Sequence, residues 1–394
     1  MKPAYLAPLI LIFIAGCVGA STFGMNEDVY QRTLASLKDR MVSLEVNKID
    51  FTGSPGETGK QKAELLQQQP RLHQVLKDLL SLSRVKKGDP EKVKLTLQKY
   101  FPSLQKELQA FAEYSPYSED DVYSFAGAHF AIGSCTILLR SGRHPLLARN
   151  YDWAPTLVDG ILAAHKGMST RFASLSMTAS IFGAYSGINE KGLSIAIAGI
   201  SSNRNYHNPG GLSIPVIVRG VLERAADVDS AVRILKQVPH TTPVNYALAD
   251  KSGNIAVVEV SPPKVVVRKD HSSKGFLTAA NHFQSLDNKE EGVSVMPNSK
   301  RRVKAVEGFQ ACNPDAGFRD VLNFMGRVKN GPAMENYSLM MGTLWSIVYL
   351  PQSCKMIIRV GLKGEPFMAG FSERAPLKIK GTIKDRPPEL KDYF

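Results

Sequence analysis

The 394-residue sequence lacks the motifs that would indicate a metalloprotein or a nucleic-acid-binding protein. It has four cysteines, no CxxC pair and no HExxH motif, which argues against a zinc site. The formal net charge of +13 is spread along the chain, and the longest basic cluster is Lys300-Arg301-Arg302. No helix-turn-helix, zinc-finger or RNP signature accompanies this charge, so no nucleic-acid partner is expected. The sequence indicates no metal or other cofactor.

No hydrophobic run near the N-terminus is long enough to cross a membrane. Lys2 precedes an apolar run from Leu6 to Ala15, which has the length of a secretion signal. Residues 1–20 are therefore predicted to be a signal peptide of an exported protein. The segment Ile14-Ala15-Gly16-Cys17 resembles a lipobox, in which a lipidated Cys17 would attach the protein to the membrane of the cell envelope. Cleavage after Val18-Gly19-Ala20 would instead give a freely secreted protein. On an exported chain, the positive charge either meets anionic lipid or cell-wall polymer or forms a basic soluble surface.

A phosphate-binding loop is also absent. The run from Gly53 to Lys60 resembles one, but its first glycine is displaced by one position and Gln61 follows the lysine. This run is interpreted as a solvated linker. From about Glu27 to Ala128 the pattern is otherwise helical and polar, with apolar residues at helix spacing: Leu34, Leu37, Met41 and Leu44, then Leu104, Leu108 and Phe111.

After residue 135 the pattern changes to strands with paired helices, which predicts an α+β fold without internal repeats. Hydrophobic residues make up 43% of the chain, enough for a large core. Helices are predicted over Ile214–Ala225 and Val228–Val238, with Asp227 as a cap. Turns are predicted at Asn189–Gly192 and Asp250–Gly253. Strands are predicted over Leu193–Ala198, Asn254–Val260, Val265–Arg268, Phe276–Ala280, Leu344–Leu350 and Met356–Val360.

Cys135 is the strongest candidate for a reactive residue. It follows small residues in Ala131-Ile132-Gly133-Ser134-Cys135-Thr136-Ile137, and a strand continues from it. The next strand ends in Ala148-Arg149-Asn150-Tyr151-Asp152-Trp153, so a hairpin would return a cation and a carboxylate to the sulfur. The ordinary alternatives are a buried core cysteine and a surface ion pair between Arg149 and Asp152.

Four further segments extend this pattern in a fixed order. They are Tyr185-Ser186-Gly187-Ile188-Asn189-Glu190-Lys191-Gly192-Leu193, Gly275-Phe276-Leu277-Thr278-Ala279-Ala280-Asn281-His282-Phe283, Asn298-Ser299-Lys300-Arg301-Arg302 and Thr343-Leu344-Trp345-Ser346. Together with the Cys135 hairpin, they resemble the N-terminal-nucleophile (Ntn) cysteine amide hydrolases. This group includes choloylglycine hydrolase, acid ceramidase and isopenicillin N acyltransferase.

The resemblance implies a four-layer αββα sandwich of two antiparallel sheets, preceded by an N-terminal helical pro-segment. It implies self-cleavage before Cys135, which divides the chain into a signal (1–20), a helical pro-segment or α-subunit (21–134) and a catalytic domain or β-subunit (135–394). Whether residues before Cys135 stay bound after cleavage is left open. No catalytic histidine is needed, because a free thiol and a free α-amino group titrate within about one pH unit of each other.

The resemblance also assigns roles to five residues. Cys135 would be the nucleophile, and its own α-amino group would be the general base. Asp152 would orient that amine, and Arg149 would favour the thiolate and steady the carboxylate. Asn281 would donate to the oxyanion, and an active-site arginine would be Arg302 in preference to Arg301.

Several positions do not transfer cleanly from the family pattern. The second oxyanion donor is unassigned, because Ser201 is the aligned residue and Asn203 is close but out of register. Cys312 and Cys354 are either a disulfide or two free thiols. Asn189 is interpreted as a turn residue tolerating a left-handed conformation, and nothing in the sequence brings His282 to Cys135 for a Cys-His protease.

The predicted activity is hydrolysis of linear, non-peptide C–N amide bonds in small N-acyl compounds through a thioester acyl-enzyme. An acyltransferase using the same intermediate is the close alternative. A non-catalytic envelope lipoprotein that acts as a binding module is the third interpretation.

Overall fold

The computed structural model describes residues 41–80, 87–129, 133–168, 171–179, 181, 183–206, 208–270, 274–337, 341–372 and 377–384. The predicted signal with Cys17, and the helical positions Leu34 and Leu37, lie outside the described residues. Among the residues that are described, no helix is long and apolar enough to span a bilayer.

The larger sheet has nine strands. They are β1 (Met41–Phe51), β4 (Ile161–His165), β5 (Ser174–Ala179), β6 (Gly183–Asn189), β7 (Ser194–Gly199), β8 (Val244–Ala249), β9 (Ile255–Ser261), β10 (Lys264–Lys269) and β16 (Leu377–Lys384). Their order is β10-β9-β8-β7-β6-β5-β4-β1-β16. Every neighbouring pair is antiparallel except β1 and β4, which are parallel.

The smaller sheet is antiparallel throughout and has seven strands. They are β2 (Ser134–Arg140), β3 (Leu146–Trp153), β11 (Phe276–Ala279), β12 (Glu335–Asn336), β13 (Met341–Leu350), β14 (Lys355–Val360) and β15 (Phe367–Ala369). The order is β11-β2-β3-β13-β14-β15, and β12 pairs with β13. Strands β2 and β3 form the hairpin that was predicted around Cys135.

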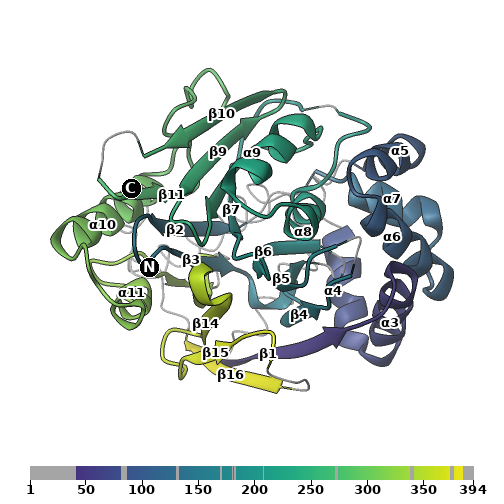
Figure 1. Ribbon diagram of the computed structural model, residues 1–394, viewed down its shortest axis with the longest axis horizontal. Coiled ribbons are helices and arrows are strands. Elements are labelled where there is room, and N and C mark those ends of the chain that lie inside the picture. The colour runs from purple at the N-terminus through teal and green to yellow at the C-terminus, as the bar shows by residue number, and fades with distance from the viewer. Residues whose placement is uncertain are drawn as a thin grey trace, which may run out of the picture.

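The two sheets lie face to face, and a helical layer covers the outer face of each (Figure 1). Helices α8 (Ile214–Arg224) and α9 (Val228–Gln237) contact the larger sheet. Helices α10 (Pro297–Cys312) and α11 (Phe318–Met325) contact the smaller one, while β2 and β3 pack against β7 and β8. This is the predicted four-layer αββα sandwich.

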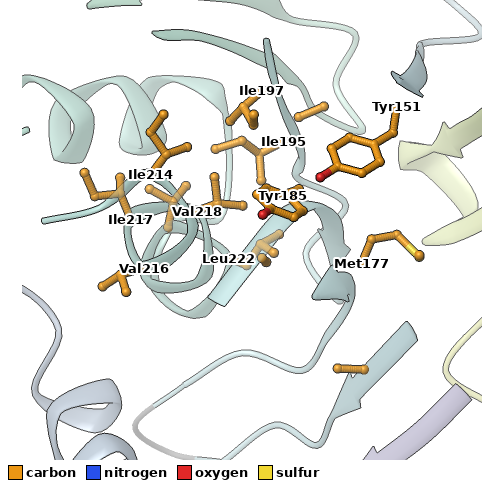
Figure 2. Packing of buried hydrophobic residues seen from close by; sticks show 14 of the residues in the cluster. Tyr151, Met177, Tyr185, Ile195, Ile197, Ile214, Val216, Ile217, Val218 and Leu222 are labelled. Carbon is orange, nitrogen blue, oxygen red and sulfur yellow. The ribbon is translucent and has the colours of Figure 1, made fainter. Parts of the chain in front are cut away.

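Apolar side chains fill the spaces between the layers. Figure 2 shows Ile217 and Leu222 of α8 beside Ile195 and Tyr185 of the larger sheet, with Tyr151 of the smaller sheet on the other side. These side chains belong to one buried cluster that continues between the two sheets. A second cluster joins the smaller sheet to α10 and α11. The β2–β3 hairpin that carries Cys135 therefore lies in the interior of the sandwich.

The helices before Cys135 form a separate group beside α8, coloured purple to blue in Figure 1. They are α3 (Pro55–Gln68), α4 (Pro70–Leu80), α5 (Pro90–Tyr100), α6 (Pro102–Tyr114) and α7 (Glu119–Ala126). The predicted helix containing Leu104, Leu108 and Phe111 is confirmed as α6. Two single-turn 3-10 helices, η2 (Pro155–Leu157) and η4 (Pro351–Ser353), lie in connections elsewhere in the chain.

The interpretation of residues 53–60 as a solvated linker is wrong, because α3 begins there. Ser54 caps the helix by accepting a hydrogen bond from the Glu57 amide, and Glu57 caps the Ser54 amide in return. Pro55 occupies the first helical turn, where its missing N–H costs nothing. Gly59 lets α3 approach α6, because a Cβ there would collide with the Glu107 carbonyl oxygen.

The helical prediction for Met41 and Leu44 is also wrong, because they belong to strand β1. Leu44, Val46 and Lys48 are buried while Glu45 and Asn47 between them are half-buried, which is the alternation of a strand with one covered face. Strand β1 lies between β4 and the C-terminal strand β16. A segment that precedes Cys135 is thus an internal strand of the larger sheet.

The predictions after residue 135 agree with the structure to within a few residues at each end. Helices α8 and α9, the Asp227 cap and all six predicted strands are confirmed. The Asn189 turn joins β6 to β7, but the left-handed residue in that turn is Gly192. Asn189 instead donates hydrogen bonds to the carbonyls of Leu222 and Ala225, which ties the turn to the end of α8.

Candidate active site

Cys135 lies in β2, opposite Tyr151 of β3, and its side chain is fully buried. The approach to it is tightly constrained. A Cβ on Gly133 would collide with the Trp153 ring and the Asp152 carbonyl oxygen, so only glycine fits there. The structure is that of the uncut chain, in which a peptide bond still joins Ser134 to Cys135.

Arg149 supplies a positive charge directly beside the sulfur. Its Nη2 atom lies 3.3 Å from Cys135 Sγ, and its Nη1 atom donates to Ser186 Oγ at 3.2 Å. Burial raises the pKa of the Cys135 thiol, and the Arg149 charge opposes that rise. The guanidinium also lies over the Tyr151 ring, 4.8 Å from its centroid. The predicted contact between Arg149 and the thiol is therefore present.

Asp152 lies on the other face of the same sheet. It lies three positions after Arg149, and the side chains of a strand alternate between faces, so the two point in opposite directions. Thr343 donates to Asp152 Oδ1 at 2.6 Å, while Oδ2 is buried without a partner among the described residues. Burial raises the pKa of this carboxyl to about 6, and the Arg302 charge is the largest opposing influence.

Arg149 contacts the thiol, and its charge also favours the ionised form of Asp152. The Arg302 charge has the larger effect on this carboxyl, and Thr343 donates a hydrogen bond to it. Neither Arg149 nor Asp152 belongs to a surface ion pair, because both are buried. The unpartnered Oδ2 atom is a free acceptor beside the start of β2, where Ser134 pairs with Asp152.

Asn281 connects both sides of the bond between Ser134 and Cys135. Its Oδ1 atom accepts the Cys135 amide N–H at 3.0 Å. Its Nδ2 atom donates to the Gly133 carbonyl at 3.2 Å and to the Gly199 carbonyl at 2.8 Å. The side-chain amide therefore lies beside the backbone that a cut would separate, although 146 residues divide Cys135 from Asn281 in the sequence.

Arg302 lies at the site and Arg301 does not. Arg302 donates to the Cys135 carbonyl at 2.5 Å, to Thr136 Oγ1 at 2.6 Å and to Asn281 Oδ1 at 2.8 Å. Its Nε atom donates to Asn298 Oδ1 at 2.8 Å, which fixes the direction of the buried guanidinium. Arg301 donates to the Gly331 carbonyl on another face of α10.

The other candidate positions lie outside this contact set. Ser201 and Asn203 are exposed, whereas Cys135 is buried, so neither side chain is assigned as the second oxyanion donor. His282 bonds Ser299 Oγ at 2.7 Å, and burial lowers its pKa to about 4. Cys312 and Cys354 are free thiols.

Three residues that support the site were not singled out from the sequence. Ser299 accepts the Asn281 amide N–H at 3.0 Å, Thr343 donates to Asp152, and Ser186 accepts from Arg149. All three lie inside the segments that carried the resemblance. Their hydroxyl groups gave no separate signal, because serine and threonine occur throughout the chain in ordinary structural roles.

A family model described as acyl-coenzyme A:6-aminopenicillanic acid acyl-transferase matches residues 139–365. The chain belongs to this family. The matched region begins after Cys135 and contains Arg149, Asp152, Asn281 and Arg302. Membership confirms the resemblance to the Ntn cysteine amide hydrolase group, and with it an enzyme family of hydrolases and acyltransferases for N-acyl amides. No curated protein sequence matches the chain.

Three solved structures are similar to the chain at low sequence identity. Penicillin V acylase from Agrobacterium tumefaciens is 18% identical, with a TM-score of 0.42 over 63% of this chain and 90% of that one. A mutant of conjugated bile acid hydrolase from Clostridium perfringens is 15% identical, with a TM-score of 0.42 over 64% and 97%. The N-acylethanolamine-hydrolyzing acid amidase ortholog of Caenorhabditis elegans is 16% identical, with a TM-score of 0.40 over 56% and 93%.

Proposed function

We propose that the chain is a precursor that cuts itself before Cys135 and then hydrolyses linear, non-peptide amides of small N-acyl compounds. One observation carries the proposal. The Asn281 side chain bonds both the Cys135 amide and the Gly133 carbonyl, while Arg149 contacts the Cys135 sulfur. The thiol and a cation thus lie beside the Ser134–Cys135 peptide bond, and one side-chain amide contacts the backbone on both sides of that bond.

The self-cleavage step begins with attack of Cys135 Sγ on the Ser134 carbonyl carbon. The C–N bond to Cys135 then breaks, its nitrogen takes up a proton, and a thioester links Ser134 to the sulfur. Water hydrolyses this thioester, which releases a Ser134 carboxylate and leaves Cys135 with a free thiol and a free α-amino group. After cleavage the Gly133 carbonyl is no longer covalently connected to Cys135 and can move away from Asn281. Asn281 Nδ2 is then free to donate a hydrogen bond to a substrate.

Turnover would reuse the same atoms. The Cys135 α-amino group takes the thiol proton, the sulfur attacks the substrate carbonyl, and Asn281 Nδ2 donates to the developing oxyanion. The amine leaves with the proton, and water then releases the acid from the thioester. The unpartnered Oδ2 atom of Asp152 is suited to accept a hydrogen bond from the α-ammonium form of Cys135.

Hydrolysis and acyl transfer share this thioester, so an acyltransferase is the close alternative. The family model carries the description of an acyltransferase, which favours testing amine and thioester partners as well as water. The third hypothesis is an envelope binding module. Its support is the complete burial of Cys135 in the uncut chain, which leaves the thiol no access to a substrate.

We also propose that the segment before Cys135 stays bound after cleavage as an α-subunit. Strand β1 pairs with β4 on one side and β16 on the other, so its departure would break two strand pairings inside the larger sheet. A buried ionic network adds to this. Glu107 of α6 lies 2.6 Å from Lys62 of α3, 3.2 Å from Arg171 and 3.4 Å from Arg219 of α8.

Loss of that segment would leave Arg171 and Arg219 without the Glu107 carboxylate. Glu223 of α8 would then be the one carboxylate of this network left to face both buried arginines. Removal of one member of a buried ionic network is unfavourable, so separation of the two pieces would be expected only together with unfolding. Size-exclusion chromatography of the processed protein tests this. Co-elution of both fragments in native buffer supports the proposal, and elution of residues 135–394 alone contradicts it.

Intact-mass analysis and N-terminal sequencing of the purified protein test the main proposal. A fragment that begins at Cys135, together with hydrolysis of N-acyl amides, is the expected result. Cys135→Ala should remain uncut, and normal processing of that variant would indicate an outside protease. An uncut wild-type chain with Cys135 unreactive to iodoacetamide would favour the binding module.

Export is proposed on the N-terminal sequence alone. Residues 1–20 have the pattern of a signal, and Cys17 has the position of a lipobox cysteine. Incorporation of labelled palmitate that Cys17→Ala abolishes would support membrane attachment in the envelope. Unlabelled protein with an N-terminus after Ala20 would support free secretion instead.

A further inference from the structure

The guanidinium of Arg149 is held from the opposite sheet by a hydrogen-bonded pair of hydroxyl groups. Arg149 lies in β3 of the smaller sheet, and Ser186 lies in β6 of the larger one. Ser186 Oγ accepts from Arg149 Nη1 at 3.2 Å and also from the Tyr349 hydroxyl at 2.8 Å. Tyr349 belongs to β13 of the smaller sheet. Both hydrogen bonds of Ser186 therefore join the larger sheet to the smaller one.

The chain of contacts from Tyr349 to the sulfur is fully buried. Ser186 and Tyr349 are both 0% exposed, and Arg149 is 1% exposed. Burial raises the pKa of Tyr349 to about 12, so its hydroxyl keeps its proton and acts as a donor near neutral pH. Tyr349 donates a hydrogen bond to Ser186 Oγ and so fixes the position of that oxygen. The same oxygen accepts the hydrogen bond from Arg149 Nη1.

We infer that Ser186 and Tyr349 are positioning residues that hold the Arg149 guanidinium against the Cys135 sulfur. Without the Ser186 oxygen, Nη1 would be a buried donor without this acceptor, and the guanidinium would turn towards another one. The Arg149 charge would then stabilise the thiolate less. The inference rests on the proposed function, because it concerns the ionisation of the proposed nucleophile.

The test is the pH dependence of Cys135 alkylation by iodoacetamide in the processed protein. In Ser186→Ala the thiol pKa should rise by about one unit, since loss of a charge-stabilising contact disfavours the thiolate. Alkylation near neutral pH should then be roughly tenfold slower, because one pKa unit changes the thiolate fraction about tenfold. Tyr349→Phe, which keeps the ring, should shift the pKa in the same direction by a smaller amount.

Ser176 provides the matched control. It is a fully buried serine in the neighbouring strand β5, opposite Gly187, and its hydroxyl has no partner among the described residues. Ser176→Ala should leave the alkylation profile unchanged. A purely structural effect of removing a buried hydroxyl would move both serine variants alike, which would overturn the inference.

The remaining outcomes separate this inference from the proposed function. If the chain is processed and active but Ser186→Ala and Tyr349→Phe keep the wild-type alkylation pKa, the positioning role is refuted and the enzyme proposal stands. If Ser186→Ala does not fold, Tyr349→Phe alone decides the question, because it keeps the aromatic ring and leaves Ser186 in place. A wild-type chain that stays uncut with an unreactive Cys135 would refute both.

Discussion

Replacement of Asn281 tests the proposed site most directly, because one side-chain amide makes four contacts there. Its Nδ2 atom donates to the Gly133 and Gly199 carbonyls, and its Oδ1 atom accepts from Cys135 and Arg302. Asn281→Ala removes all four contacts. Asn281→Asp keeps the two acceptor contacts and removes the two donated hydrogen bonds.

The expected loss of rate follows from the donor function. Removal of one oxyanion donor costs about 3 kcal/mol of transition-state stabilisation, or roughly 10²–10³ in kcat. Both variants should slow processing and turnover by this factor, and the aspartate adds charge repulsion at the oxyanion. Stability should separate them. In Asn281→Ala the free energy of unfolding should fall by about 1–3 kcal/mol, because Arg302 and the Cys135 amide lose an acceptor. In Asn281→Asp most of the wild-type stability should remain, because the acceptor oxygen is kept.

The assays are the rate of appearance of the Cys135 terminus, hydrolysis of an N-acyl amide, and chemical denaturation. Asn288→Ala is the matched control, since that half-buried side-chain amide bonds the Phe283 backbone in a loop away from Cys135. It should lose some stability and keep wild-type rates. Wild-type rates in Asn281→Asp would refute the donor role, and an equal loss of rate in Asn288→Ala would show that the effect is structural.

Three further predictions concern stability. In an uncut Cys135→Ala precursor, Asp152→Asn should stabilise the fold at pH 7 but not at pH 4, as measured by thermal denaturation. The sign follows because the folded pKa of about 6 exceeds the ordinary value of 3.8. The Asp152 carboxyl therefore makes the fold less stable as the pH rises between these values, by about 3 kcal/mol in total. Equal effects of the substitution at both pH values would contradict this. Glu107→Gln should cost about 3–5 kcal/mol in denaturant unfolding because Lys62 loses its carboxylate partner and the two buried arginines keep only Glu223 of this network. Glu119→Gln, in a partly exposed pair, should cost under about 1 kcal/mol, and similar costs for the two variants would argue against the network. Gly59→Ala should lower the melting temperature because its methyl group would meet the α6 backbone, and an unchanged melting temperature would show that the two helices can separate freely.

Local patterns were sufficient for most of the elements after residue 135. Alternating apolar residues and Gly-containing turns identified the strands and their hairpins, because each of these features depends on neighbouring residues. The same reasoning failed at Met41–Phe51, where a few apolar residues fitted both helix and strand spacing. The burial of alternate residues in β1 depends on β4 and β16, which come from distant parts of the chain.

The start of α3 could have been predicted from the sequence. Ser54, Pro55 and Glu57 occupy the N-cap, the first helical position and the third helical position of a helix start. The prediction of a linker rested instead on the glycines of this run, which resemble those of a phosphate-binding loop. The opposite directions of Arg149 and Asp152 also follow from sequence alone, because an odd separation on a strand places two side chains on different faces.

The sequence by itself determined the candidate nucleophile, the hairpin that carries it and the family order of the segments around it, because each rests on short-range spacing. Only the tertiary structure decided which distant groups meet there. Asn281 reaches Cys135 because β11 pairs with β2, and Arg302 reaches it in place of Arg301 because adjacent residues of α10 face different directions. Ser186 meets Arg149 because the two sheets pack face to face, and no local pattern in either strand encodes that contact.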